Sequence, residues 1–324
     1  MASHTTIAWA QRSWNPLKGC SMARGSELGG CERCYACRLA ATRLGGPGQP
    51  YEGLARVTRS GPRWTGEVRF VPEHLEDPLK WQAPSRIFTA SMSDPHHEHV
   101  PWEWLDQIAA VIQLSHWHEH LLLTKRAERL REYWAHPETE ARVHGAMAQL
   151  VLRSSRAAMA SRTYRQQPYR FPPANLWLGV SVEDPATAER RIPDLLATNA
   201  AVKWVSYEPA LASVNFHRVA DGRGYTFDAL SRKGGIAFRE GVGLDWVVVG
   251  GESGPGARAM KAGWAKDVID QCRDAGVPVF MKQAGTLLAR EWGCRDRKGE
   301  DVTEFPEAFR VREYPETGRS REEC

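Results

Sequence analysis

Short apolar runs alternate with amphipathic segments along most of the chain. The apolar runs have the length of buried strands, and they lie at residues 5–9, 86–90, 120–123, 175–180, 202–205, 244–249 and 277–281. Helical spacing of apolar residues predicts helices at residues 36–44, 101–115, 126 to about 152, 185–198 and 264–275. This alternation predicts a parallel sheet that is covered by helices.

Polar or charged residues follow each predicted strand after the first one. In a (β/α) barrel the carboxyl ends of all strands meet at one face, which carries the active site. About seven strands favour a barrel over an open doubly wound sheet, and no glycine-rich dinucleotide fingerprint opens a helix. The sequence therefore predicts an α/β fold, a partial or near-complete (β/α) TIM-type barrel, as a single domain over residues 1–294.

Three regions interrupt this rhythm. Residues 137–173 and 216–243 are rich in basic side chains and are predicted to be insertions between barrel units. Residues 45–66, rich in Gly, Pro and Arg, are predicted to be a loop, and residues 295–324 a charged, peripheral tail.

The composition is that of a soluble globular protein, with 42% hydrophobic and 25% charged residues. No window approaches the roughly 18 consecutive apolar residues of a transmembrane helix. The first residues, MASHTTIAWAQRSW, lack the basic start and apolar run of a secretory signal. We therefore expect a cytoplasmic protein without a membrane partner, in which thiols stay reduced.

Four of the seven cysteines lie close together, at Cys20, Cys31, Cys34 and Cys37. Clustered thiols in a reducing compartment bind metals more often than they form disulfides. Four thiolates could close around a structural zinc ion. The CxxCxxC run is also typical of an iron–sulfur loop. A third arrangement uses three cysteines and leaves one iron of a cluster open, and spacing alone does not separate the three.

Several motifs, in the same order, resemble one known family: WNPLKGC, GGCERCYA, FTASMSD, LLTKRAERL, NLWLGVSVED, VSYEPAL, GGESGPGARAM and VFMKQAG. This is the phage- and prophage-associated three-cysteine family of unknown function, which is similar to radical S-adenosylmethionine enzymes of the spore photoproduct lyase type. The resemblance covers about residues 7–285, apart from the two basic segments. It implies a partial TIM-type barrel with a 4Fe–4S cluster and S-adenosyl-L-methionine as cofactors.

Carried over to this chain, the three cluster ligands of the family are Cys20, Cys31 and Cys34. The ten residues between the first two depart from the usual radical-enzyme spacing. Tyr35 follows the last ligand and is expected near the cofactor, as a substitute for an aromatic that usually precedes that ligand. Cys37 is additional to the family pattern. It is either a small helix residue facing the core or a fourth ligand that would close the site.

The resemblance also implies where S-adenosylmethionine is held. The end of the second strand is expected to meet the methionine amine, with Asp94 as the first candidate beside Ser91 and Ser93. Lys125 and Arg126 follow the third strand and suit the methionine carboxylate or a substrate phosphate.

Later strand ends complete this face. Ser181 and Glu183 are candidates for the ribose hydroxyls or the carboxylate, and Ser206 for the ribose or the substrate. Gly250 and Gly251 form a tight turn that lets the backbone approach the adenine or the substrate closely.

Three charged residues, Glu208, Glu252 and Lys282, are the candidates for catalysis on the substrate, with Gln283 beside them. For every strand-end residue, a salt bridge at the barrel rim or a helix cap is the structural alternative. The histidines at residues 96–99 and 116–120 are expected on loops and solvated edges rather than at a metal.

The expected reaction is reductive cleavage of S-adenosylmethionine to a 5′-deoxyadenosyl radical, which abstracts hydrogen from a substrate. Basic segments and thirteen tryptophans fit nucleic acid, so the expected substrate is a base or a thymidine-type hypermodified base of phage DNA. A flavodoxin or ferredoxin is the expected reducing partner. The alternatives are a radical enzyme for a small metabolite or peptide, and a zinc-stabilised, non-catalytic nucleic-acid-binding protein.

Overall fold

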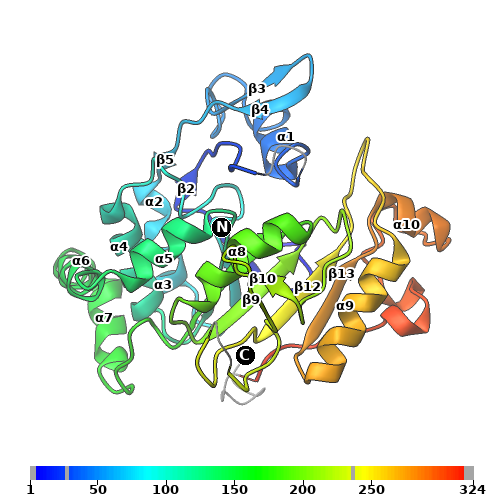
Figure 1. The fold of residues 1–324 in the computed structure, drawn as a ribbon. Helices are drawn as coiled ribbons and strands as arrows, with labels where there is room; N and C mark the ends of the chain where they lie inside the picture. Colours follow the sequence, from blue (N-terminus) through cyan, green and yellow to red (C-terminus); the bar gives the residue numbers. More distant parts are fainter. Residues whose placement is uncertain (1–4, 26–28, 235–237, 317–324) are drawn as a thin grey trace.

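The protein is described from a computed structural model, which covers residues 5–25, 29–234 and 238–316. Seven parallel strands form one sheet that curls into an open half-barrel (Figure 1). The strands are adjacent in chain order: β1 (Arg12–Trp14), β6 (Arg86–Thr89), β7 (Glu119–Thr124), β8 (Leu176–Val182), β9 (Val202–Tyr207), β12 (Trp246–Gly250) and β13 (Val279–Gln283). The predicted partial (β/α) barrel is thus confirmed at the level of architecture.

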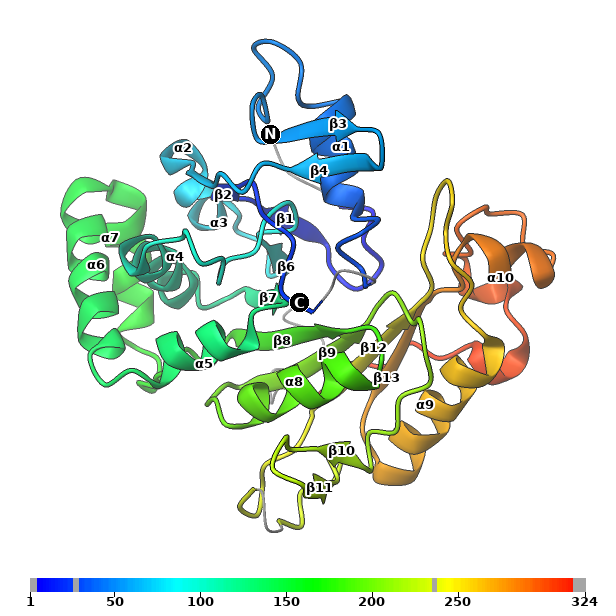
Figure 2. The same ribbon diagram turned by 45° about the horizontal axis from the view of Figure 1, so that its top comes forward.

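Helices cover the outer face of the half-barrel (Figure 2). Asp184 caps one of them by accepting a hydrogen bond from the backbone of Thr187 at 2.8 Å, and Gly276 ends another in the left-handed conformation, with φ of 69°. These helices are α4 (Trp102–Leu114), α5 (Ala127–Ala135), α6 (Thr139–Arg153), α7 (Ser155–Tyr164), α8 (Pro185–Leu196) and α9 (Ala262–Ala275).

The opposite face of the sheet carries a second, aromatic core. Trp204 packs edge-on against Trp9, with ring centroids 5.3 Å apart, and lies 5.4 Å from Trp246. Gly179 of β8 makes room for this packing, because a Cβ there would lie 2.3 Å from the Trp204 ring. The strand predicted for residues 5–9 is wrong. Their apolar side chains pack against this core instead of extending the sheet.

A small extension stands at the end of the molecule where α1 lies (Figures 1 and 2). It combines α1 (Tyr35–Thr42) with the antiparallel hairpin β3 (Ala55–Thr58) and β4 (Gly61–Trp64). The prediction of a loop for residues 45–66 is therefore wrong for residues 55–64, which form the hairpin. Nearby, β2 (Leu17–Lys18) pairs with β5 (Arg69–Phe70), and the short helices α2 (Pro72–Leu75) and α3 (Asp77–Lys80) follow.

The two predicted basic insertions lie away from this extension (Figure 2). The first comprises all of α6 and α7, and α6 packs beside α4. The second carries the short strands β10 (Val219–Ala220) and β11 (Thr226–Phe227), and its residues 235–237 fall outside the described part.

Residues 295–316 pack into the fold and are not a peripheral tail. Phe305 is 1% exposed, and Trp246 donates a hydrogen bond to the Glu313 carbonyl at 2.8 Å. Residues 317–324 lie outside the described residues. The last elements are α10 (Thr286–Glu291) and the 3-10 turns η1 (Val302–Glu304) and η2 (Glu307–Phe309). None of the helices in the described ranges has the length and apolar content of a membrane span.

Candidate active site

A cavity of about 640 Å³ opens at the carboxyl ends of the sheet strands. The cysteine loop and the start of α1 form one wall, and the strand-end residues form much of the rest. Most predicted site residues line it: Cys20, Cys31, Cys34, Tyr35, Ser91, Ser93, Asp94, Lys125, Ser181, Ser206, Glu208, Gly251, Glu252, Lys282 and Gln283. The two exceptions are Glu183 and Gly250, which lie behind this lining layer and contact it.

Asp94 is the most heavily hydrogen-bonded carboxylate at the cysteine side of the cavity. It accepts from the Thr124 hydroxyl at 2.7 Å and from Arg126 Nη1 at 3.0 Å. Burial alone would raise the pKa of Asp94, but Arg126 and the other donors outweigh it and hold that pKa below its usual range. Asp94 also caps its own turn, accepting from the His96 backbone at 2.9 Å.

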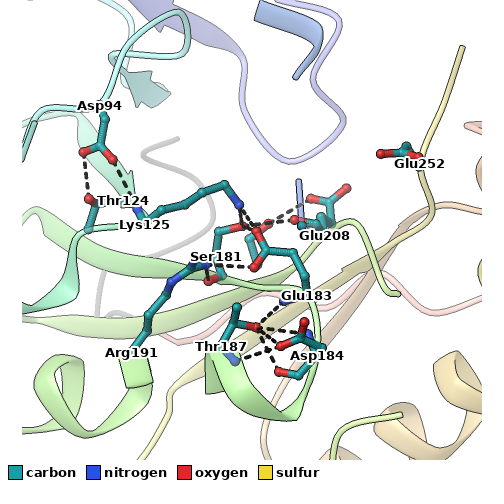
Figure 3. A network of polar contacts seen from close by, with 12 residues as sticks. Asp94, Thr124, Lys125, Ser181, Glu183, Asp184, Thr187, Arg191, Glu208 and Glu252 are labelled. Carbon is teal, nitrogen blue, oxygen red and sulfur yellow. Dashed lines mark hydrogen bonds and ion pairs between the residues drawn. The ribbon is translucent and has the colours of Figure 1, made fainter. Parts of the chain in front are cut away.

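A buried charge network lies in the middle of the cavity floor (Figure 3). Lys125 reaches across to β8, where its Nζ donates to the Ser181 hydroxyl at 2.6 Å and pairs with Glu183. Arg191 of α8 approaches the same carboxylate from below, with Nη1 at 2.9 Å from Oε2. Glu183 is fully buried, so it positions Lys125 rather than reaching a ligand itself.

Glu208 and Lys282 form an ion pair across the other half of the cavity, 2.9 Å apart. Ser206 donates to the same carboxylate at 3.1 Å. Gly250 makes room for it, because a Cβ there would lie 2.3 Å from Glu208 Oε1. At Gly251 a Cβ would lie 2.3 Å from the Ala284 carbonyl oxygen, so packing within the protein explains both glycines.

Glu252 has a partner that the sequence analysis missed. Arg258 donates to it from Nε at 3.0 Å and from Nη2 at 2.7 Å. The same guanidinium donates to the Gly29 carbonyl at 3.0 Å and pairs with Glu32 at 3.2 Å. It therefore ties the loop after β12 to the cysteine loop. The signal was present in the GESGPGAR motif, where this arginine follows Glu252 across a glycine-rich turn.

The three expected cluster ligands share one wall of the cavity. Burial raises the pKa values of Cys20 and Cys34, and the neighbouring thiols raise them further. Arg126 Nη1 lies 3.9 Å from Cys20 Sγ and opposes this effect. The three soft thiols line the same cavity, and their donor chemistry suits an iron–sulfur cluster. Within the described residues, which omit 26–28 of this loop, no three His, Cys, Asp or Glu side chains are grouped around one point for a metal ion.

The two residues beside the last ligand have separate structural roles. Tyr35 donates from its hydroxyl to the Ser91 carbonyl at 2.7 Å and so joins α1 to the end of β6. Cys37 is buried at 3% exposure and is not among the residues that line the cavity. The core-facing interpretation of Cys37 therefore agrees with its position.

The comparisons with known proteins place this chain in a family. The family model for "Protein of unknown function (DUF5131)" matches residues 4–316. The chain belongs to the DUF5131 family. No curated protein and no solved structure matches it. The match includes the cysteine loop, every strand of the half-barrel and the described part of the chain after residue 294.

In this DUF5131 protein the two serines after β6 make hydrogen bonds within the protein. Ser91 donates to the Asn15 side chain at 3.2 Å, and Ser93 donates to the Leu17 carbonyl at 3.2 Å. The preceding residue, Ala90, has a φ of 62°, a left-handed conformation that side chains disfavour. These contacts fix the turn that places Asp94.

The histidine prediction was wrong about exposure for four of the six histidines, whereas His99 is exposed as predicted. His96, His97, His118 and His120 have no exposed surface. Burial lowers the pKa values of His96, His97 and His118 to about 4, so they are neutral at physiological pH. Trp134 donates to His96 at 3.3 Å, and Ser115 lies 2.9 Å from His120. The rings of His96, His118 and His120 pack beside aromatic side chains, and that of His97 lies 2.8 Å from Ser21 of the cysteine loop, which their polar sequence context conceals.

Proposed function

We propose that this DUF5131 protein is a radical S-adenosylmethionine enzyme of the phage-associated three-cysteine type. Cys20, Cys31 and Cys34 would hold a 4Fe–4S cluster with one open iron, and a flavodoxin or ferredoxin would supply the electron. The substrate is a base, or a thymidine-type hypermodified base, of DNA. The observation that carries the proposal is that the cysteine loop and the ring of strand-end polar residues enclose the same cavity.

The bound cofactors supply a one-electron cleavage of S-adenosylmethionine and a hydrogen-abstracting radical. The chain supplies orientation. Asp94 is kept ionised by Arg126, so it can accept hydrogen bonds from the methionine amine. Lys125, fixed by Glu183, points a cation at the position for a carboxylate.

The far side of the cavity suits the substrate. Lys282 offers a donor and Glu208 an acceptor, side by side, which matches the mixed donor and acceptor edge of a nucleobase. Glu252 is less exposed to a ligand because Arg258 occupies both of its oxygens. We therefore assign Glu208 and Lys282 to the substrate and Glu252 to positioning of the cysteine loop.

The test is anaerobic reconstitution with iron and sulfide, followed by reduction in the presence of S-adenosylmethionine. The proposal predicts a brown protein that forms 5′-deoxyadenosine. Replacement of Cys20, Cys31 or Cys34 by Ala abolishes both the colour and the product, whereas C272A, at a buried cysteine of α9, retains them. Stoichiometric zinc without cleavage would contradict the proposal and support the zinc-stabilised alternative.

The substrate class is tested separately from the cofactor. The reduced enzyme is offered DNA containing thymine-derived modified bases, and the nucleosides are analysed by mass spectrometry after digestion. A change in one base is the predicted result. Cleavage of S-adenosylmethionine that is stimulated only by a small metabolite or a peptide would overturn the DNA assignment and leave the radical chemistry standing.

A further inference from the structure

The extension formed by α1 and the β3–β4 hairpin carries an excess of positive charge. Residues 33–69 contain seven arginines and two glutamates, a net charge of +5, whereas the whole chain has a net charge of +4. The remainder of the protein is therefore close to neutral. Such a concentration of one charge beside a cavity attracts a polyanion.

Two of these arginines belong to the cavity wall itself. Arg33 and Arg38 both line the cavity, next to the cysteine ligands and Tyr35. Within the described ranges, neither guanidinium has a carboxylate at ion-pair distance. The loop after β12 closes over them: a Cβ at Gly254 would lie 2.6 Å from Arg38 Nη1, and one at Gly256 would lie 3.0 Å from Arg33 Nη1.

Two further arginines face each other on the hairpin. Arg56 of β3 is the direct cross-strand partner of Arg63 of β4. Like charges in this position destabilise a hairpin, and no described carboxylate forms an ion pair with either of them. Arg63 donates to the Glu32 carbonyl at 3.3 Å, so this face of the hairpin adjoins the cysteine loop, whose next residue is Arg33.

We infer that Arg33, Arg38, Arg56 and Arg63 form a phosphate-binding track that leads a single-stranded or flipped-out nucleic acid into the cavity. This inference rests on the proposed function and replaces the two predicted basic insertions as the site of backbone contact. Trp64 and Tyr35, which is 47% exposed, line the same opening and provide aromatic faces for an unstacked base. An acidic protein partner needs neither the aromatic faces nor the depth of the cavity.

The test measures binding of a fluorescein-labelled single-stranded DNA oligonucleotide by anisotropy over a range of salt concentrations. The track variant is R38Q/R56Q/R63Q; Arg33 is left intact because it lies between two cluster ligands. The matched control is R156Q/R162Q/R165Q, which removes three exposed arginines from α7 and the residue that follows it. Circular dichroism and the thermal midpoint confirm that both variants are folded.

Each lost phosphate contact lowers the slope of log K against log salt by about 0.7 for a single strand. The track variant is therefore expected to lose about two units of slope, and about a hundredfold in affinity at roughly 0.1 M salt. The control variant keeps the slope and affinity of the unmodified protein. Equal loss in both variants, or unchanged binding in the track variant, would overturn the inference.

Two comparisons distinguish the arginine track from the proposed cofactor chemistry and from a binding surface for an electron carrier. The binding assay contains neither S-adenosylmethionine nor reductant, so a failure of cofactor cleavage with intact arginine-dependent binding contradicts only the proposed function. If instead the track variant binds DNA normally and is reduced more slowly by flavodoxin, the surface receives an acidic electron carrier and the nucleic-acid track is refuted.

Discussion

Glu183 illustrates how a single buried side chain organises the cavity floor. Its carboxylate lies between Lys125 and Arg191 and has no exposed surface. A buried carboxylate of this kind is stable only while both cations stay in place. The consequence is a fixed Lys125 ammonium at the cavity surface.

The charge of Glu183 makes the stability of the protein depend on pH. Burial alone would raise the pKa of Glu183, but Lys125 and Arg191 outweigh it and lower that pKa below the ordinary value of 4.5. A lowered folded pKa adds stability that is complete above the unfolded value and is lost as the pH falls through the folded value. E183Q is therefore expected to lower the free energy of unfolding at pH 7 by about 3 kcal/mol.

Urea unfolding at several pH values checks this expectation. The difference between the unmodified protein and E183Q should shrink as the pH falls below 4.5, because the carboxyl group is then protonated in the unfolded chain and finally in the folded one. A difference that stays constant from pH 7 to acid would show that the charge of Glu183 contributes nothing to stability.

Gly250 and Gly263 provide a matched pair of glycine substitutions. A Cβ at Gly250 would overlap the Glu208 carboxylate, whereas a Cβ at Gly263 of α9 meets nothing within 4 Å. G250A should lower the thermal midpoint and displace Glu208 from Lys282. G263A should raise the midpoint slightly, since Ala is favoured over Gly by up to about 1 kcal/mol in a helix and Gly263 lies in the first turn of α9. Equal midpoints would contradict this account of Gly250.

At the scale of elements, the opposed arginines of the β3–β4 hairpin are expected to affect the stability of the DNA-free protein. Because Arg56 and Arg63 are directly opposed, R56Q should stabilise the isolated protein by about 0.2–1 kcal/mol while it weakens binding of DNA. Thermal unfolding of the DNA-free protein at low salt is the measurement. A destabilised R56Q protein would show that the two guanidinium groups are not in conflict.

The sequence predicted the strands of the half-barrel because parallel strands are buried on both faces and so consist of continuous apolar runs, as in β8 and β12. The β3–β4 hairpin escaped prediction because its strands carry arginine, proline and glycine and are only partly buried. The β-prone run at residues 5–9 was misread because apolar side chains suit an aromatic plug as well as a strand.

The candidate site was also predicted only in part from the sequence. Strand-end polar residues were found because a parallel half-barrel places all its carboxyl ends at one face. Their partners were not, since Arg191 and Arg258 come from a helix and a loop whose distance from the site only the fold sets. The buried position of Glu183 was likewise invisible, because the sequence does not distinguish a lining residue from the one behind it.

At the scale of the whole molecule, the basic extension and the sheet enclose the cavity from two sides. The cysteine loop lies between them and is fixed to the sheet through Arg258 and, across the Tyr35–Ser91 hydrogen bond, through α1. This arrangement brings the thiols, the strand-end residues and the arginine track to one opening. Under the proposed function, the thiols and Asp94 form the cofactor side of this single cavity, and Glu208 and Lys282 form its substrate side.

The central claim is that three cysteines hold a cluster whose fourth iron is open to S-adenosylmethionine. Electron paramagnetic resonance of the reduced, reconstituted protein tests it most directly, with C37A as the companion variant. The account predicts a 4Fe–4S signal that shifts when S-adenosylmethionine is added, and the same signal and shift in C37A. A signal that S-adenosylmethionine leaves unchanged, or one that disappears in C37A, would contradict the account because the cluster would then have four protein ligands.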